Sequence, residues 1–255
     1  MLSRSLTALV RDLRLRRGRE RRGLTLAEGI RLVEEALAAG IAIRHVLASP
    51  GLEATPRGRS LQAALAGAGH RLEPVSEKVF ETLAATEQPQ GVLAVIELPR
   101  WTLEQIRPGP AAPVLVLDGV QDPGNVGTMI RTAFGLGAAG VVALPGTAEL
   151  ANPKTLRATM GGAFRLPAVV MEEVGFRAWT EKLGVRVLLA QAGQGLPKPR
   201  LAVPIALVLG NEGAGIRPSL SSWAHGTIGI PLRAGAESLN VAVAAGILLY
   251  QVTRE

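Results

Sequence analysis

The sequence predicts an α/β protein of two domains, the second built on a mostly parallel sheet. A chain of 255 residues can bury a sizeable core. From residue 113 onward, apolar runs of strand length alternate with helix-length segments, and several runs are continuously apolar, as in strands buried on both faces. Residues 101–112 are rich in proline and lack sustained periodicity. We therefore expect a first domain at 1–100, a linker at 101–112 and a second domain at 113–255.

The first domain is predicted to be a small α/β unit. Thr25 followed by Glu28 matches a capping box and predicts a helix at 26–37 that ends at Gly40. Strands are predicted at 41–48, 71–75 and 91–98, with further helices around 61–66 and after Ser76.

The second domain alternates strands with helices more regularly. Strands are predicted at 113–119, 140–145, 166–171, 185–190, 204–210 and 226–231, and helices at 125–136, 153–160, 174–183, 216–224 and 238–253. Ligands of a parallel sheet usually lie beyond the carboxyl ends of its strands. Three segments have that position and contain polar residues: 117–137, 207–216 and 230–255.

Composition excludes several classes of site. The chain has no cysteine, so it forms neither a disulfide framework nor a thiolate metal site, and three scattered histidines (45, 70 and 225) do not form a zinc pattern. We expect no metal. The N-terminus lacks a signal-peptide pattern, and the apolar stretch near the C-terminus is too short to span a bilayer. A cytoplasmic protein without a membrane partner is the expectation.

The net charge of +7 is unevenly placed. Seven arginines lie between Arg11 and Arg22, offset only by Asp12 and Glu20. Such a run favours a polyanionic partner, because each phosphate contact releases a counterion and arginine adds fork-shaped donors. A solvated basic terminus is the alternative. Aromatic residues make up only 3% of the chain, which speaks against a stacking platform for single strands. Recognition should therefore rely on charge and shape.

The segment LDGVQDPGNVGTMIRTAFGLG (117–137) has the order strand, loop, helix. Pro123 and Gly124 shape a tight turn, and Asn125 is predicted to cap the helix. Arg131 lies a little under two turns later in a helix lined by apolar residues. It needs a partner or an opening to solvent, because an unpaired buried charge is costly.

The stretch LVLGNEGAGI (207–216) runs from a strand directly into glycines. Gly210, Gly213 and Gly215 let a ligand approach the backbone closely. Glu212 lies between them, either as a functional carboxylate or as an ordinary surface residue.

The segment IPLRAGAESLNVAVAAGILLYQVTRE (230–255) contains the last predicted helix. Ser238 is the predicted N-cap, and the helix after it is apolar nearly all round until Tyr250, so it is predicted to be buried. Asn240 lies just inside that helix and, if buried, has to be hydrogen-bonded.

Two sequence features required of a nucleotide-binding Rossmann protein are not met. GLGAAG (135–140) fits G-x-G-x-x-G, but it ends a predicted helix and opens a strand, the reverse of the required order. A Rossmann-type methyltransferase also needs an acidic residue at the end of its second strand, which GVVALPG lacks. Helix termination explains the glycines better.

Together, DPGNVGTMIRTA, LVLGNEGAGI and IPLRAGAESLNVAVAAGILLY resemble, in order and spacing, the three motifs of the SPOUT methyltransferases, specifically the TrmH (SpoU) branch that methylates the ribose 2′-hydroxyl of RNA. The first hundred residues resemble, more loosely, the substrate-binding domain of the ribosomal RNA members, which has a ribosomal-protein-like α/β fold. The matching stretches include RGLTLAEGIRLVEEAL and TEQPQGVLAVIE.

The resemblance implies a trefoil-knotted catalytic domain, a homodimer whose sites are composed from both chains, and S-adenosylmethionine as cofactor, bound in the knot. It assigns activation of the ribose hydroxyl to Arg131. Because a guanidinium stays protonated, we expect Arg131 to orient the ribose and phosphate and to stabilise the developing alkoxide. Asn125, Glu212, Ser238 and Asn240 would hold Arg131 and the loops in position. The implied cofactor contacts are Leu209, Gly210, Ile230, Leu232, Ser238 and Leu239.

The implied substrate is RNA, in a loop or bulge where the 2′-hydroxyl is accessible. The N-terminal domain favours 23S ribosomal RNA over transfer RNA. The expected RNA contacts are Arg14, Arg16, Arg17, Arg21 and Arg22, with Lys154, Arg157 and Arg165 near the catalytic site.

Three alternatives stay open from the sequence. One is a transfer RNA 2′-O-methyltransferase. Another is a noncatalytic RNA-binding or ribosome assembly factor, which the intact motif residues oppose. The last is a Rossmann-type methyltransferase with another substrate, which an open, unknotted sheet would favour.

Overall fold

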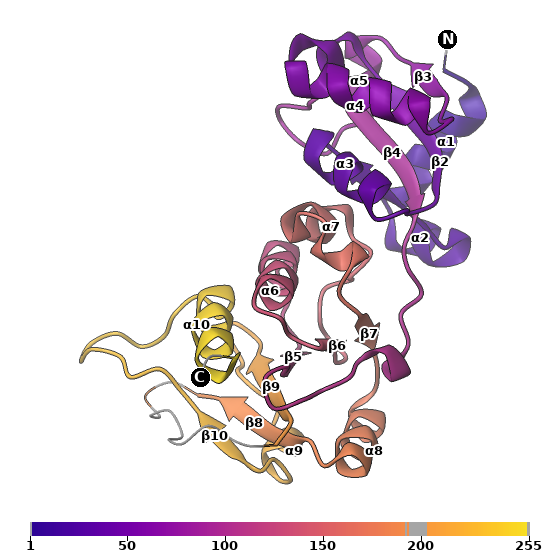
Figure 1. Cartoon of the computed structure of the whole chain (residues 1–255). Coiled ribbons are helices and arrows are strands. Elements are labelled where there is room, and N and C mark those ends of the chain that lie inside the picture. Colours follow the sequence, from indigo (N-terminus) through magenta and orange to yellow (C-terminus); the bar gives the residue numbers. More distant parts are fainter. Residues whose placement is uncertain (1, 192, 194–202, 254–255) are drawn as a thin grey trace. The chain divides into compact units, whose positions relative to one another are not determined.

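The computed structural model describes residues 2–191, 193 and 203–253 (Figure 1). The chain divides into two compact units. The first comprises Met1–Arg100 with Ala151–Phe164, and the second comprises Trp101–Leu150 with Arg165–Glu255. A short segment from the middle of the sequence therefore packs with the N-terminal unit, although the sequence pattern places it in the second domain.

The first unit is built on a four-stranded mixed sheet of order β1-β4-β2-β3. The strand β4 pairs antiparallel with both β1 and β2, and β2 pairs parallel with β3. The strands are β1 (Leu24–Glu28), β2 (Ile43–Ala48), β3 (Leu72–Pro74) and β4 (Val92–Glu97).

Helices cover both faces of this sheet. The buried side chains of β4 alternate between two cores: Ala94 and Ile96 pack with α3 and α4, whereas Leu93 and Val95 pack with α1 and α5. This alternation makes β4 a fully buried central strand. The helices of the unit are α1 (Arg4–Leu13), α2 (Arg16–Arg22), α3 (Ile30–Ala38), α4 (Pro56–Gly67), α5 (Glu77–Leu83) and α7 (Pro153–Thr159), with short 3₁₀ helices at Pro50–Ala54 and Gly162–Phe164.

The capping box predicted at Thr25 is wrong, because this stretch is strand β1 and the helix begins only at Ile30. Tertiary contacts use both polar side chains: the Thr25 hydroxyl donates to the carbonyl of Ala151 at 2.6 Å, and Glu28 accepts from the backbone of a distant loop. Gly29, at φ +99°, makes the change of direction between strand and helix.

The second unit contains a six-stranded sheet of order β10-β8-β9-β5-β6-β7. Every adjacent pair is parallel, which confirms the predicted mostly parallel α/β sheet. The central strands are buried on both faces, which explains their continuous apolar sequence. The strands are β5 (Val114–Asp118), β6 (Gly140–Ala143), β7 (Ala168–Val170), β8 (Arg186–Ala190), β9 (Ile205–Gly210) and β10 (Gly226–Ile228).

The helices of this unit match the predicted positions, with shifts at their ends. The helix expected at 216–224 is reduced to the single turn α9. No helix in the described part of the chain is long and apolar enough to cross a membrane. The helices are α6 (Pro123–Gly135), α8 (Glu173–Leu183), α9 (Pro218–Ser221) and α10 (Val241–Thr253), with a 3₁₀ turn at Leu103–Gln105.

Two predicted N-caps are wrong. Asp122, not Asn125, caps α6, because its side chain accepts from the backbone N–H of Asn125 at 2.8 Å. Asn240, not Ser238, precedes the first turn of α10, and its Oδ1 accepts from the N–H of Ala242 at 2.9 Å. The helix α10 is also less buried than predicted, since Val243 and Tyr250 are about half exposed.

Candidate active site

A cavity of about 480 Å³ opens beyond the carboxyl ends of β8 and β9, where a parallel sheet places its ligands. Its walls come from the end of β9, the glycine-rich loop after it, the segment after β10 and the start of α10. All six residues predicted to contact the cofactor line this cavity: Leu209, Gly210, Ile230, Leu232, Ser238 and Leu239.

The glycine-rich loop closes tightly on itself. Asn211 and Gly215 exchange backbone hydrogen bonds of 2.9 and 3.0 Å, and the Asn211 Oδ1 accepts from the N–H groups of Gly213 and Ala214. A Cβ atom on Gly210 would lie 2.3 Å from the carbonyl carbon of Gly215, so no side chain fits there. The loop therefore presents backbone directly to the cavity.

Glu212 braces two loops. Its carboxylate accepts from the backbone N–H groups of Gln121 at 3.1 Å and Asp122 at 3.3 Å, and from the Asn125 Nδ2 at 3.0 Å. Partial burial opposes ionisation, but the hydrogen bonds, led by that of Asn125, together hold the pKa of Glu212 below its ordinary value. Glu212 is thus a carboxylate at neutral pH and an acceptor of three donors.

Asn240 extends this brace to the third motif. Its Nδ2 donates to the Asn125 Oδ1 at 3.1 Å, while its Oδ1 caps α10. The chain Glu212, Asn125, Asn240 links the loops after β5, β9 and β10 in one hydrogen-bonded series. Asn240 is exposed rather than buried. Its amide is therefore held in place by the hydrogen bonds to the start of α10 and to Asn125, and not by burial.

Arg131 is not part of this brace. Within the described residues no hydrogen bond or ion pair involves its side chain, which is exposed. It lies in a separate hollow between α6 and α10, whose lining is Arg131, Thr132, Gly135, Leu136, Gly246, Ile247, Tyr250 and Gln251. Of the two possibilities that the sequence left for this arginine, the structure shows the opening to solvent.

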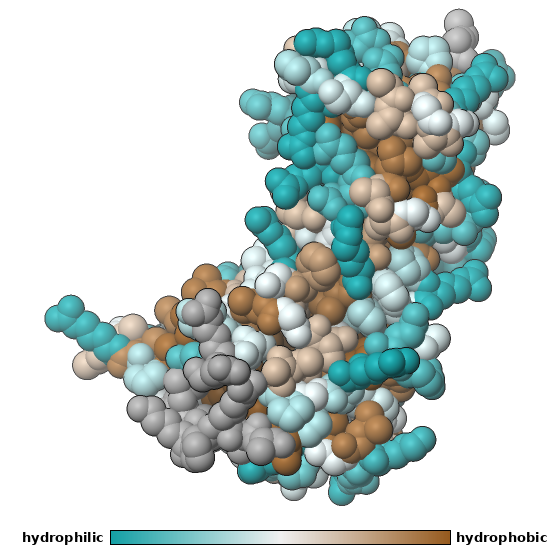
Figure 2. All heavy atoms as spheres, in the orientation of Figure 1, coloured by the Kyte–Doolittle hydropathy of each residue, from teal (hydrophilic) through white to brown (hydrophobic). Residues whose placement is uncertain are grey.

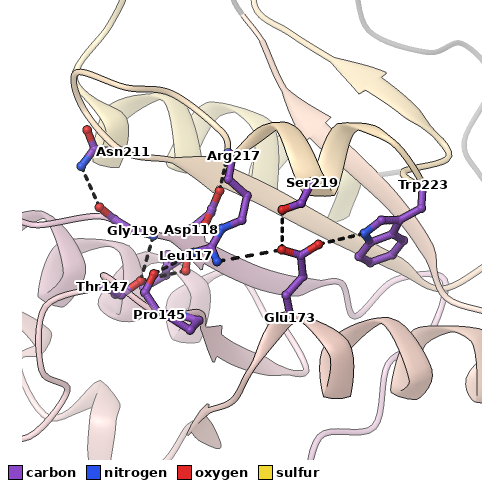
Figure 3. A network of polar contacts seen from close by, with 10 residues as sticks. All are labelled: Leu117, Asp118, Gly119, Pro145, Thr147, Glu173, Asn211, Arg217, Ser219 and Trp223. Carbon is purple, nitrogen blue, oxygen red and sulfur yellow. Dashed lines mark hydrogen bonds and ion pairs between the residues drawn. The ribbon is translucent and has the colours of Figure 1, made fainter.

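A second polar network connects the two ends of the glycine-rich loop, Asn211 and Arg217, to other elements of the second unit (Figure 3). Asp118, at the end of β5 and 2% exposed, accepts from the backbone N–H of Arg217 at 2.8 Å and pairs with its guanidinium. The Arg217 Nη2 donates to the carbonyl of Pro145 at 2.7 Å, and its Nη1 lies 3.9 Å from Glu173. Arg217, which follows the glycine-rich loop, thus contacts β5, the segment after β6 and the start of α8.

Glu173 and Asn211 complete this network. Glu173 accepts from the Ser219 hydroxyl at 2.6 Å and from the Trp223 indole at 3.2 Å. The Asn211 Nδ2 donates to the carbonyl of Gly119 at 2.8 Å (Figure 3). Sequence reasoning missed Asp118, Asn211 and Arg217. The one available signal was an aspartate closing the otherwise apolar run VLVLD.

A model of the SpoU rRNA Methylase family matches residues 112–250, and a model of the MRM3-like substrate binding domain matches residues 9–94. The chain belongs to the SpoU rRNA methylase family. This membership removes the Rossmann-type alternative.

Relatives in this family are similar over nearly the whole chain. The 23S rRNA (guanosine(2553)-2′-O)-methyltransferase RlmP of Bacillus subtilis (strain 168) is 36% identical over 95% of this chain and 93% of its own length. The 23S rRNA (uridine(2479)-2′-O)-methyltransferase of Streptomyces viridochromogenes is 29% identical over 94% of this chain and 86% of its own. An AdoMet-bound rRNA methyltransferase from Sinorhizobium meliloti superposes with a TM-score of 0.85 at 31% identity, over 99% of this chain and 95% of that one.

The arginines at the N-terminus of this SpoU family member are folded into helices. Arg16 pairs with Glu20 at 2.7 Å, and Asp12 pairs with both Arg21 and Arg22. The hydrogen bond from Arg22, aided by Arg21, holds the pKa of Asp12 below its ordinary value. The expected RNA contacts of this run, Arg14, Arg16, Arg17, Arg21 and Arg22, are all exposed.

The remaining basic residues predicted to contact RNA divide between the units. Lys154 and Arg157 lie on α7, which packs in the first unit, whereas Arg165 begins the second part of the other unit. In the described residues no group of three or more histidine, aspartate and glutamate side chains could hold a metal ion.

Proposed function

We propose that this protein transfers a methyl group from S-adenosylmethionine to a ribose 2′-hydroxyl of 23S ribosomal RNA. The observation that carries the proposal is the hydrogen-bonded series Glu212, Asn125, Asn240, which joins the three motif loops beside a cavity lined in part by backbone. Relatives across nearly the whole chain are named for this reaction on 23S rRNA.

The cavity fits S-adenosylmethionine by its chemistry. The exclusion of a Cβ at Gly210 keeps backbone N–H and carbonyl groups close to a ligand, and Leu209, Ile230 and Leu232 supply apolar surface for an adenine ring. We assign Ser238 and Leu239 to the same wall. When bound, the cofactor supplies an electrophilic methyl group on sulfur.

The chain's own residues would position the ribose and stabilise charge. Arg131 is exposed, and its guanidinium has no hydrogen-bond or ion-pair partner in the part of the chain that the structure describes, so it is available to an RNA phosphate and to the developing alkoxide. Glu212 is a poor choice of base, because its lowered pKa weakens it as a proton acceptor. We assign Glu212, Asn125 and Asn240 the task of holding the loops, and leave the 2′-hydroxyl proton to another acceptor, such as solvent or the RNA.

The separation of Arg131 from the cofactor cavity favours a second copy of this chain as part of the site. Arg131 lies between α6 and α10, whose surface exposes Phe134 (43%), Val243 (52%) and Tyr250 (44%). Hydrophobic atoms are visible over α10 in Figure 2. We propose a homodimer that covers this face and brings Arg131 of one protomer to the cofactor of its partner, and, with the family, a trefoil knot in the catalytic domain.

The exposed arginines of α2 supply the phosphate contacts in this proposal, and the N-terminal unit favours ribosomal over transfer RNA as substrate. The protein would work in the cytoplasm, where ribosomal RNA is processed.

Transfer of labelled methyl from S-adenosylmethionine to unmodified 23S rRNA and, separately, to transfer RNA tests the proposal. Alkaline hydrolysis of the product follows, because a 2′-O-methyl group protects the adjacent linkage. A labelled alkali-resistant dinucleotide from 23S rRNA alone is the expected result. Label in transfer RNA alone would show that transfer RNA, and not 23S rRNA, is the substrate. If no methyl group is transferred and the cofactor does not bind, a noncatalytic RNA-binding role is favoured.

A further inference from the structure

A second cavity, of about 240 Å³, lies inside the first unit and has no part in the proposed chemistry. The end of β1 and start of α3 form one wall, the loop before β4 a second, and the C-terminal end of α7 a third. All the lining residues belong to the same unit: Glu28, Gly29, Arg31, Leu32, Thr86, Gln88, Gln90, Arg157 and Met160.

The lining includes Arg157, whose side chain is 35% exposed. Its Nη1 atom is buried and has no hydrogen-bond acceptor among the residues that the structure describes. The nearest carboxylate oxygen, Oε2 of Glu28, is 4.0 Å away, too far for a hydrogen bond. A buried donor without an acceptor is costly, so Nη1 calls for an acceptor from outside the protein, either an ordered water or a ligand.

Glu28 cannot approach Arg157 more closely without giving up other bonds. It is 4% exposed and accepts from the backbone N–H of Ala85 at 2.8 Å, the N–H of Thr86 at 3.1 Å and the Thr86 hydroxyl. These bonds fix the loop that forms the second wall. The carboxylate therefore shapes the cavity and balances the charge of Arg157, while the Nη1 donor stays available.

The rest of the lining suits a flat polar ring. Gln90 uses its Oε1 to accept from the N–H of Ile30 at 2.9 Å, which leaves its amide donors for a ligand. Leu32 and Met160 provide apolar surface. Met160 has φ 50°, the one positive φ outside glycine in the described chain, because it caps the C-terminal end of α7 in the left-handed conformation.

We propose that this cavity binds one unstacked nucleotide of the RNA substrate, whose base presents a carbonyl oxygen to the Nη1 of Arg157. The inference rests on the proposed RNA substrate and adds a recognition site to it. The volume is below the roughly 300–1,000 Å³ of pockets for drug-sized ligands, so it suits a single base. Sequence-specific RNA recognition relies on unstacked bases read at their edges. Arg31, exposed at the rim, is suited to the adjoining phosphate.

The names of two relatives indicate why a base-reading site in the N-terminal unit would be useful. The Bacillus subtilis relative is named for a guanosine and the Streptomyces viridochromogenes relative for a uridine. If the same catalytic site methylates nucleotides with different bases, the site alone does not determine which nucleotide is methylated. The enzyme then has to recognise other nucleotides of the RNA as well. A base pocket in the N-terminal unit would do so.

Binding of unmodified 23S rRNA to the full-length protein, measured as a function of salt, tests the proposal. Gln88→Trp places a bulky ring among the lining residues, and Arg157→Gln removes the donor fork. We expect each to weaken RNA binding about ten-fold, with the salt slope little changed, because a base contact releases no counterion. Arg71→Gln is the matched control: its side chain is 86% exposed in the same unit, outside the cavity lining.

Thermal unfolding and cofactor affinity, unchanged in all variants, identify the losses as effects on RNA binding. Wild-type RNA affinity in Gln88→Trp overturns the proposal. So does a salt slope reduced by about one in Arg157→Gln with Gln88→Trp unaffected, because Arg157 then meets a phosphate. Failure of the wild-type protein to bind 23S rRNA would instead contradict the proposed substrate, and is seen before any variant is compared.

Discussion

Asn240 donates a hydrogen bond from its Nδ2 to the Oδ1 of Asn125 at 3.1 Å, across 115 positions of sequence. Each asparagine also holds a partner of its own: Asn240 caps α10, and Asn125 donates to Glu212 at 3.0 Å. Because one amide oxygen and one amide nitrogen of Asn125 are both engaged, its orientation is fixed. The loops around the 480 Å³ cavity are thus held by backbone N–H groups and asparagine amides, and Glu212 is the one carboxylate in this series.

The first prediction concerns Asn125→Asp, which places a second carboxylate against Glu212 and removes the donor between them. We expect cofactor affinity and methyl transfer to fall at least about ten-fold, because two close like charges repel in a partly desolvated site. Calorimetric titration with S-adenosylmethionine measures the loss. Asn152→Asp is the control, since Asn152 caps α7 and an aspartate caps equally well. Equal affinity in both variants would show that the brace does not support the cavity.

The second prediction follows from the lowered pKa of Glu212. Its folded-state pKa lies below the ordinary value of 4.5, so its stabilising contribution is present above pH 4.5 and is lost as the pH falls through the folded value. We expect the difference in melting temperature between wild type and Glu212→Gln to be constant from pH 8 to 5 and to shrink below about pH 4.5. Thermal unfolding across this range checks it. A difference that shrank already near pH 6 would contradict the lowered pKa.

The third prediction tests the buried pair beneath the glycine-rich loop. Asp118→Asn leaves the Arg217 guanidinium without its nearer carboxylate, and removing one partner of a buried pair costs about 3–5 kcal/mol. Arg217 is partly exposed, so we expect the lower end of that range in denaturant unfolding. Glu97→Gln, in the exposed pair with Arg44, is the matched control and should cost less than about 1 kcal/mol. Similar costs for the two variants would reduce the Asp118 pair to an ordinary surface contact.

The central strands of the second unit were predictable because they are continuous apolar runs, the pattern expected of strands buried on both faces. The glycines after β9 predicted that a ligand could approach the backbone closely, and the exclusion of a Cβ at Gly210 agrees with this. That the ligand is S-adenosylmethionine came from the resemblance and stays a prediction. The helix caps were not predictable. Asp122 and Asn125 compete for one cap, and the contact of Asn125 with Glu212, 87 positions away, decides between them.

Long-range polar pairs explain two of the other failures. Thr25 and Glu28 fit a local capping rule, yet their partners lie at Ala151 and Thr86, and those bonds require a strand. The Asp118 pair spans 99 positions and is invisible to any local pattern. The placement of α7 in the first unit has a different cause, the apolar packing of Leu156 in a core that includes residues of α3 and β4.

The fourth prediction concerns Arg131. Arg131→Ala should lower methyl transfer about 10²–10³-fold, as for removal of a group that stabilises developing charge, with cofactor affinity nearly unchanged. The control is Arg107→Ala, at an exposed position of the same unit where no hydrogen bond or ion pair of the described residues involves the arginine side chain. If Arg131 serves the partner's cofactor, mixing Arg131→Ala with Leu239→Arg, which blocks the cavity, should restore transfer. No restoration in a proven mixed dimer would place Arg131 and the cofactor in one chain.

The fifth prediction is that the arginines of α2 contribute unequally to RNA binding, according to whether each is already paired with a carboxylate of the protein. Arg16 is held by Glu20, and Arg21 and Arg22 share Asp12, so each would have to exchange a protein carboxylate for an RNA phosphate. Arg17 is exposed and no ion pair in the described chain involves it. We expect Arg17→Ala to reduce the slope of log affinity for 23S rRNA against log salt by about one, and Arg16→Ala by less. Glu20→Gln, which removes the carboxylate paired with Arg16, should strengthen binding and steepen the slope. Unchanged slopes in all three variants would make this helix a solvated surface, and would leave the RNA contacts to residues such as Lys154 and Arg165.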